Sequence, residues 1–240
     1  MKKFSLICLI VAMSVMLSSI AMAKPKQNPS GPPALVVNGT VIPACYQKIN
    51  GQLRVVSDPG QCRPSEVPIS LSSPPQPKTV FITSLTYVGA AIGGIAGADA
   101  LCNTLAATVV PGLAGTYKAW ISDDSMGPAA TFTHNMGPYV NTHGDIIAND
   151  WIGLTSGVIL KPILYDESGA NLTPPTGGPI DVWTGTDPFG HPVVGQTCFS
   201  WTAVGVDGIQ GLGMVTTPLW TMAPPPANCT GMAHLYCFEQ

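Results

Sequence analysis

The sequence predicts an α+β fold, rich in loops and stapled by disulfides, with a small β-hairpin module in front of it. Six of the seven cysteines follow the amino-terminal apolar run, and such an even set is typical of exported, disulfide-bonded proteins. Apolar residues recur at helical spacing over residues 98–105, whereas strand-like runs stand near both ends of the larger part. Between residues 122 and 192 the periodicity fades into turns, which favours a loop-rich domain over a layered α/β enzyme.

Residues 1–23 have the pattern of a secretory signal peptide. Lys2 and Lys3 precede an apolar run over residues 4–20, and Ala21, Met22 and Ala23 form a small-residue cleavage site. The alternative is an uncleaved membrane anchor, which the small residues at the end of the run disfavour. No later stretch approaches the roughly 18 to 20 apolar residues of a membrane-spanning helix. We therefore expect an exported protein without a transmembrane segment, located in the periplasm, at the cell surface or in the medium.

The charge of the chain excludes polyanionic partners. Of its 240 residues, ten are basic and 13 are acidic. Without Lys2 and Lys3, eight basic residues remain against the same 13 acidic ones, so the formal net charge is −5. After residue 78 the only basic residues are Lys118 and Lys161. Nucleic acid and heparin require clustered Lys and Arg, so neither is expected as a partner.

Residues 41–72 predict a disulfide-bonded β-hairpin module. Asn50 and Gly51 lie between two β-rich runs and form the strongest short hairpin signal, because both residues tolerate positive φ. A second turn over residues 58–60 folds Cys62 back towards Cys45, which predicts a disulfide between them. A unit this small buries little apolar surface, and a disulfide offsets that deficit.

Two segments flank this module without a pattern of their own. Residues 24–40 predict a flexible leader, and residues 73–78 a stiff, proline-rich linker. The main domain, residues 79–240, follows the linker and opens with a strand-like run that begins at Lys78.

The main domain is expected to contain one helix early in the chain. Apolar residues at helical spacing share one of its faces, whereas Asp99 and Asn103 are expected to point elsewhere. Pro111 and Gly112 end this helix, and residues 117–121 read as a strand. Three further short strands are expected, at residues 139–140, 146–148 and 163–165. The glycine-rich residues 205–213 lack a following helix, so a mobile surface loop is expected there rather than a phosphate-binding loop.

Candidate ligand-binding residues come from two observations. His134, His143, Asp145 and Asp150 lie close in sequence and could bind a cation or a polar ligand, although turns favour these residue types anyway. Trp220 stands in a proline-rich, turn-rich segment, where an exposed indole could stack on a sugar ring. We predict no cofactor and no metal site. Zinc is the rival explanation of the cysteines, but no C-x-x-C pair exists.

The sequence offers no catalytic motif, and we predict a non-enzymatic protein. No G-x-S-x-G motif is present, which leaves a serine hydrolase without support. Asp166 and Glu167 are adjacent, and neighbouring side chains of a strand face opposite sides, so a shared acid–base site is not expected. A cysteine nucleophile is excluded if all six cysteines pair.

Two resemblances refine these expectations. Residues 39–45, 50–56 and Cys62 resemble a short cysteine-paired hairpin of many exported bacterial proteins. The larger part resembles the endostatin-like branch of the C-type-lectin-like fold and, more closely, the exported bacterial DUF1554 family of unknown function. The motifs that carry this second resemblance span most of the domain: residues 93–99, 112–120, 133–134, 137–140, 148–151, 166–169, 182–187 and 235–239, with Cys102, Cys198, Trp201 and Thr202.

The second resemblance implies two nested disulfides, Cys102 with Cys237 and Cys198 with Cys229. The calcium ligands of C-type lectins have no counterpart before Cys229, and the histidine-rich zinc segment and the arginine face of endostatin have none either. We therefore expect an exported recognition or adhesion protein that binds a glycan or an extracellular protein without calcium. The alternatives are a structural envelope or surface protein without a dedicated ligand and, less favoured, a hydrolase on the same fold.

Overall fold

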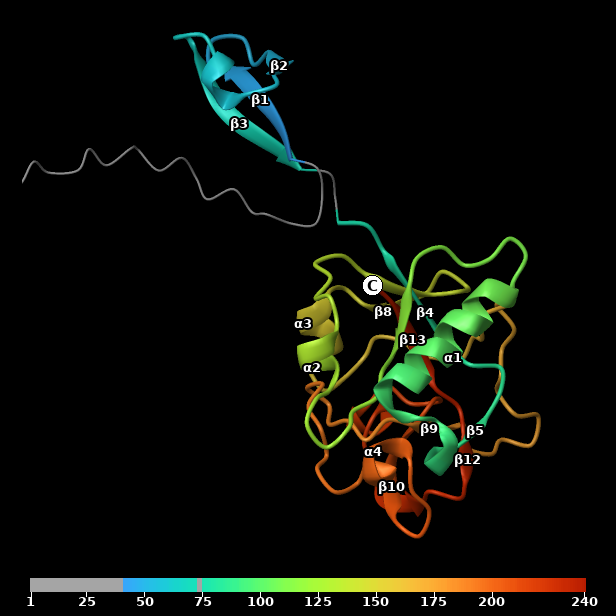
Figure 1. Cartoon of the computed structure of the whole chain (residues 1–240). Helices are drawn as coiled ribbons and strands as arrows, with labels where there is room; N and C mark the ends of the chain where they lie inside the picture. The colour runs from blue at the N-terminus through green and yellow to red at the C-terminus, as the bar shows by residue number, and fades with distance from the viewer. Residues whose placement is uncertain (1–40, 73–74) are drawn as a thin grey trace, which may run out of the picture. The chain divides into compact units, whose positions relative to one another are not determined.

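The computed structural model of the chain describes residues 41–72 and 75–240. The expected signal peptide, the leader and residues 73–74 of the linker lie outside the described residues. Figure 1 shows the two described parts, whose positions relative to one another are not determined. Within these two ranges, no helix is long and apolar enough to cross a membrane.

The amino-terminal part is a three-stranded antiparallel sheet. Its central strand is β1 (Val41–Gln47), flanked by β2 (Leu53–Val55) and β3 (Glu66–Ser72). The β1–β2 hairpin is the predicted one, and Gly51 in its turn has φ +72°, a value that glycine adopts without strain. Strand β3 was not predicted; it pairs with β1 along its whole length.

The main part, residues 75–240, combines short strands with four α-helical segments and two short 3-10 helices, Gly89–Ala91 and Pro218–Trp220. Its helices are α1 (Gly94–Thr108), α2 (Pro128–Thr131), α3 (Trp151–Leu154) and α4 (Cys198–Trp201). Its strands are β4 (Lys78–Ile82), β5 (Tyr87–Val88), β6 (Tyr117–Ala119), β7 (Tyr139–Asn141), β8 (Ile146–Ala148), β9 (Asp181–Trp183), β10 (Asp207–Leu212), β11 (Ala223–Asn228), β12 (Met232–Ala233) and β13 (Tyr236–Glu239). The described chain is thus a mixed α+β protein, as expected, and most of its regular structure is sheet.

The central sheet has the strand order β6-β13-β4-β7-β8. The last strand, β13, lies between β4 and β6 and pairs with both in antiparallel fashion, so the two ends of this part meet in one sheet. Strands β9, β10 and β11 form a second sheet, and β5 pairs with β12. Of the expected strands at residues 139–140, 146–148 and 163–165, the first two are present, whereas the third region contributes only an isolated bridge from Tyr165 to Asn171.

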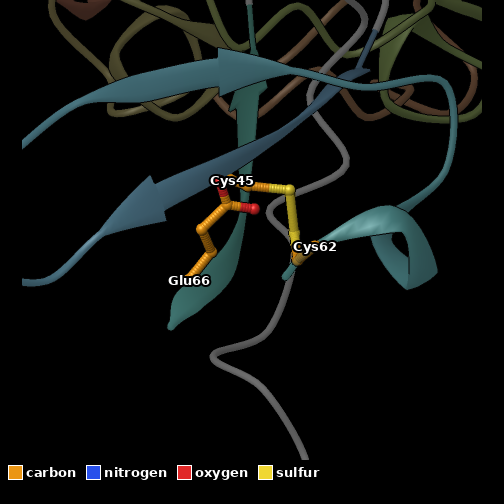
Figure 2. Close-up of side chains that lie close together, drawn as sticks. All are labelled: Cys45, Cys62 and Glu66. Carbon is orange, nitrogen blue, oxygen red and sulfur yellow. A yellow bond between two sulfur atoms is a disulfide. The ribbon is translucent and has the colours of Figure 1, made fainter. Parts of the chain in front are cut away.

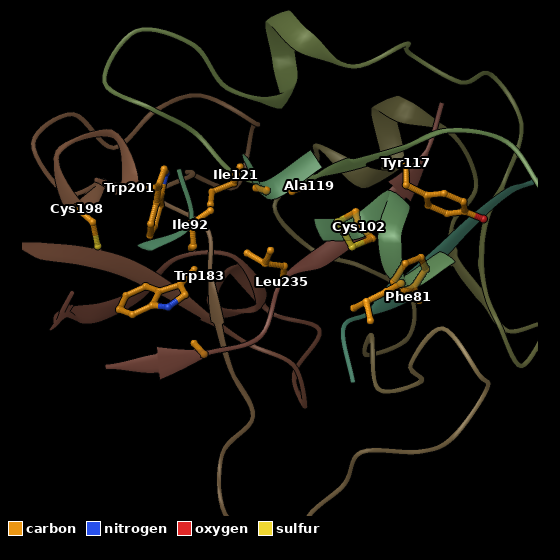
Figure 3. Packing of buried hydrophobic residues seen from close by; sticks show 14 of the residues in the cluster. Phe81, Ile92, Cys102, Tyr117, Ala119, Ile121, Trp183, Cys198, Trp201 and Leu235 are labelled. Atoms are coloured by element: carbon orange, nitrogen blue, oxygen red, sulfur yellow. A yellow bond between two sulfur atoms is a disulfide. The ribbon is translucent and has the colours of Figure 1, made fainter. Parts of the chain in front are cut away.

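Side chains alternate across the central sheet and separate two apolar clusters. Along β13, Tyr236 and Phe238 pack into one cluster and Cys237 packs into the other, as the two-residue period of a strand requires. Figure 3 shows the second of these clusters extending from Cys198, Trp183 and Trp201 to Cys102, Phe81 and Tyr117. It lies between the sheet and α1, whose buried residues are Ala98, Cys102, Leu105 and Ala106.

The structure contains three disulfides. They join Cys45 to Cys62, Cys102 to Cys237, and Cys198 to Cys229. These are the pairs that the turns of the hairpin and the resemblance of the main part led us to expect. Cys102–Cys237 ties α1 to the last strand, and Cys198–Cys229 closes a shorter loop inside the longer one.

The expectation of a mobile loop at residues 205–213 was wrong. Residues 207–212 form β10, the middle strand of the second sheet. The glycines of this stretch provide space rather than mobility. A Cβ at Gly208 would lie 2.6 Å from Cys198 Sγ, and one at Gly211 would lie 2.0 Å from the Trp220 carbonyl oxygen. The strand therefore packs directly against the disulfide on one side and the segment of Trp220 on the other.

Candidate functional site

The predicted cluster of His134, His143, Asp145 and Asp150 divides into two unconnected groups. His143 Nδ1 lies 3.5 Å from Asp145 Oδ2, and the imidazole stacks on the ring of Tyr165 at 4.6 Å. This pair belongs to the turn between β7 and β8, where Asn141 also donates to Asp145. The group is exposed and does not enclose a site.

The other group surrounds the start of α3. Asp150 is the N-cap of this helix, since its Oδ1 accepts a hydrogen bond of 2.6 Å from the Gly153 N–H. His134 stacks on Trp151 with the ring centroids 4.1 Å apart, and its Nε2 lies 3.1 Å from the Ala129 carbonyl oxygen. The carboxylate of Asp150 thus serves the helix end, and the structure does not bring it together with both histidines.

Trp220 is buried, contrary to the prediction that it is exposed. Its exposed fraction is 0 %, and its ring packs on Trp120 at 4.9 Å and on Tyr236 at 5.7 Å. Pro218 begins a short 3-10 turn that ends at Trp220, and the backbone of Trp220 packs directly against Gly211 of β10. Proline-rich sequence indicated a turn correctly but not the direction of the side chain. A sugar cannot stack on this indole.

Asp166 and Glu167 also have separate structural roles. Asp166 Oδ1 accepts hydrogen bonds from the Ser168 and Ala170 N–H groups and so closes the turn that follows it. Both oxygens of Glu167 accept from Ser84, one from its N–H and one from its hydroxyl. The two carboxyls have no hydrogen-bond partner in common, so they do not form a shared acid–base site.

Within the described ranges, the one group of three side chains with metal-ligand spacing is Cys45, Cys62 and Glu66. Figure 2 shows Glu66 beside the disulfide of the hairpin module. Both sulfurs are bonded to each other, so neither is a thiolate that could ligate an ion. Glu66 Oε2 lies 2.7 Å from Arg54 Nη2, and this hydrogen bond, followed by one from the Arg63 N–H, holds the pKa of Glu66 below its usual value. Glu66 is thus already committed to an ion pair.

A different feature of the main part is a strained and exposed loop. Residues 198–207 form a loop closed by a bridge between Thr197 and Gly208 and by the Cys198–Cys229 disulfide. We refer to this segment as the 198–207 loop. It begins with α4, whose four residues have left-handed backbone angles: φ is +51° at Cys198, +52° at Phe199, +53° at Ser200 and +64° at Trp201.

This left-handed turn is unfavourable in itself. A left-handed helical conformation costs about 1 to 2 kcal/mol per residue for side chains other than glycine. Such conformations persist only where the surroundings determine them, and they concentrate at functional positions. The turn therefore requires strong anchors.

Buried groups on both sides supply these anchors. Trp201 is fully buried, donates from Nε1 to the Ser122 carbonyl at 2.7 Å, and contacts Trp183 with ring centroids 5.6 Å apart. Thr197 is equally fixed, because its hydroxyl donates to Asp124 at 2.7 Å and accepts from the Ser200 N–H at 3.2 Å. The turn is thus held at both ends, and its middle is directed outward.

The outward surface of the loop is apolar. The exposed fractions of Phe199 and Val204 are 71 % and 67 %, and Val206 is also exposed. No charged residue occurs from residue 198 to residue 206. A domain that places a phenylalanine in solvent at the tip of a strained turn exposes apolar surface at a defined position, which is typical of a contact site. The preceding turns expose Phe189 and Val194 in addition.

Sequence reasoning missed this loop because its decisive property is a backbone conformation. Residues 198–201 include no glycine or asparagine, the residue types that would indicate positive φ. The absence of charge between Cys198 and Asp207 was the one signal available. No protein-family model matches the chain, and no curated protein sequence is significantly similar to it.

Proposed function

We propose that the chain is an exported, non-enzymatic recognition or adhesion protein whose C-type-lectin-like main domain binds an extracellular protein or glycan without calcium. The single observation that carries this proposal is the 198–207 loop, in which a strained turn holds Phe199 in solvent. The exposed aliphatic residues of the same loop, Val204 and Val206, favour a protein over a sugar as the ligand, because sugars need polar partners for their hydroxyl groups.

Two further features support the proposal. Three disulfides in one chain are typical of an oxidising, extracytoplasmic environment. The nested disulfides are the two pairs that the resemblance to the C-type-lectin-like and DUF1554 families implies. In a scaffold of this kind, rigid sheets position loops that carry the ligand contacts.

The test uses the secreted full-length protein and two variants of the strained turn. Phe199→Asn removes the exposed ring and places a residue that tolerates positive φ. Ser200→Gly relieves the same backbone and leaves Phe199 in place. Each protein is screened against arrays of extracellular proteins and glycans, and its unfolding free energy is measured in urea.

We expect Phe199→Asn to weaken binding about tenfold or more, because truncating a central aromatic contact typically costs about 2 kcal/mol. Its stability should be unchanged or higher, by about 1 kcal/mol, since the strain is reduced. Ser200→Gly should keep full binding. The proposal fails if the wild-type protein binds no member of either array, or if Phe199→Asn binds as tightly as the wild type.

A further inference from the structure

The three-stranded sheet of the hairpin module has two chemically distinct faces. Residues that pair directly across antiparallel strands point to the same side, and neighbours along a strand point to opposite sides. Cys45 pairs with Arg54 and with Pro68, so these three side chains share one face. The same face carries Glu66 and the disulfide, as Figure 2 shows. Residues 57–65 connect β2 to β3 on this side, and Cys62 and the Arg54–Glu66 ion pair tie this connection down.

The opposite face consists of seven aliphatic side chains and one tyrosine. We call it the apolar face, and its members are Ile42, Ala44, Tyr46, Leu53, Val55, Val67, Ile69 and Leu71. Ala44 is buried at its centre, whereas Val55 and Leu53 on the edge strand have exposed fractions of 61 % and 51 %. In residues 41–72 no helix or further strand covers this face. An exposed, contiguous apolar face of this kind is typical of an interaction surface.

We infer that the apolar face is a self-association surface on which the same face of a second copy of this chain packs. A face without charges or hydrogen-bonding side chains, apart from the Tyr46 hydroxyl, is complementary to itself, and packing it on its copy leaves no buried charge unpaired. Two such sheets pack about 10 Å apart with their strands nearly aligned, which is the arrangement of a β-sandwich.

The area of the face predicts a weak, concentration-dependent dimer. Strands of seven residues at about 3.3 Å per residue, with neighbours about 4.8 Å apart, give a footprint of roughly 20 by 15 Å, on the order of 300 Å². Two such footprints bury on the order of 600 Å², less than the roughly 1,200 Å² at the low end of stable protein interfaces. The association should therefore be reversible.

The apolar run of the leader is too short to cover this face. This run, residues 34–37, extends at most about 14 Å, whereas β1 spans about 23 Å. The rest of residues 24–40 is dominated by Lys, Pro, Asn, Ser and Gly, which do not replace an apolar partner. A second copy supplies a matching surface over the full length.

The experiment is sedimentation velocity of the secreted full-length protein from about 10 µM to about 1 mM, the range in which so small an interface equilibrates. Val55→Lys places a charge at the most exposed position of the apolar face. Ser70→Lys is the matched control, because Ser70 is exposed on the opposite face of the same sheet. Mapping of the Cys45–Cys62 disulfide verifies that the module of each variant is folded, and Leu53→Lys replaces Val55→Lys if that variant is not.

We expect the wild type and Ser70→Lys to dimerise as concentration rises, and Val55→Lys to remain monomeric, with its apparent dissociation constant raised at least tenfold. A wild-type protein that is monomeric throughout the range overturns the inference. Dimerisation of Val55→Lys equal to that of the wild type overturns it as well.

Discussion

Asn103 on α1 and Tyr117 on β6 exchange two hydrogen bonds. Asn103 Oδ1 accepts from the Tyr117 N–H at 2.9 Å, and Asn103 Nδ2 donates to the Tyr117 carbonyl at 2.7 Å. One helical turn away, Asp99 Oδ1 accepts from the Ala119 N–H at 2.8 Å. The helix thus supplies to the outer edge of β6 the hydrogen bonds that a neighbouring strand would otherwise make. Asp99 and Asn103 are not among the buried apolar residues of α1, as expected, and both side chains form hydrogen bonds with β6.

Replacing Asn103 by Ala should destabilise the main domain by about 2 to 3 kcal/mol, because the N–H and carbonyl of Tyr117 both lose their partner in a partly buried place. Thr104→Ala is the control on the next residue of the helix. Thr104 is exposed and donates only to the Ala100 carbonyl, so its loss should change stability by less than about 0.5 kcal/mol. Urea unfolding followed by tryptophan fluorescence measures both values. Equal effects of the two substitutions would contradict this account of the α1–β6 contact.

Asp99 should make stability depend on pH. Burial raises the pKa of Asp99 above its usual value, against the opposing effects of the Ala119 hydrogen bond and Lys118. The folded protein therefore prefers the protonated acid, and this contribution is lost as pH rises through the folded-state pKa. We expect Asp99→Asn to gain stability relative to the wild type between about pH 3 and pH 6, measured by denaturant unfolding. A difference between Asp99→Asn and the wild type that does not change with pH would refute the assignment.

Gly97 should not tolerate a side chain. A Cβ at this position of α1 would lie 2.0 Å from the Ile92 carbonyl oxygen, which is backbone and cannot move without shifting the start of the helix. We expect Gly97→Ala to cost about 1 to 3 kcal/mol although alanine favours helices. At Gly178 nothing lies within 4 Å of an added Cβ. Gly178→Ala should therefore leave the melting temperature nearly unchanged, and calorimetry distinguishes the two.

The two disulfides of the main part should contribute differently. Cys102–Cys237 spans 135 residues and Cys198–Cys229 spans 31. Chain-entropy estimates give about 5 kcal/mol for the first and about 4 kcal/mol for the second, as upper limits. Replacing Cys102 and Cys237 by Ala should therefore lower the free energy of unfolding more than replacing Cys198 and Cys229 by Ala. Loss of Cys198–Cys229 should also release the 198–207 loop, so this double variant should bind its ligand more weakly even when it is fully folded. The Cys102/Cys237 double variant should bind with normal affinity as long as it is folded.

Much of the fold could be predicted from short-range chemistry. Asn50 and Gly51 specify their turn, and the spacing of Ala98, Cys102 and Leu105 specifies a helix with its apolar side inward. These signals depend on neighbours within a few residues. The burial of Trp220 depends instead on Gly211, and the left-handed turn at Phe199 depends on Ser122 and Cys229. Contacts of this range leave no local pattern, which is why neither the burial of Trp220 nor the left-handed turn at Phe199 could be predicted from the sequence.

The Cys102–Cys237 bond makes a covalent ring of nearly the entire main domain. A protease that cuts the chain once anywhere between these two cysteines opens the ring but releases no fragment, because both pieces stay joined through the bond. A single cut within residues 199–228 opens the smaller Cys198–Cys229 ring as well and again frees nothing. This connectivity lets the domain survive a nick in its exposed loops as one molecule, and reduction is needed before the damage can separate its parts.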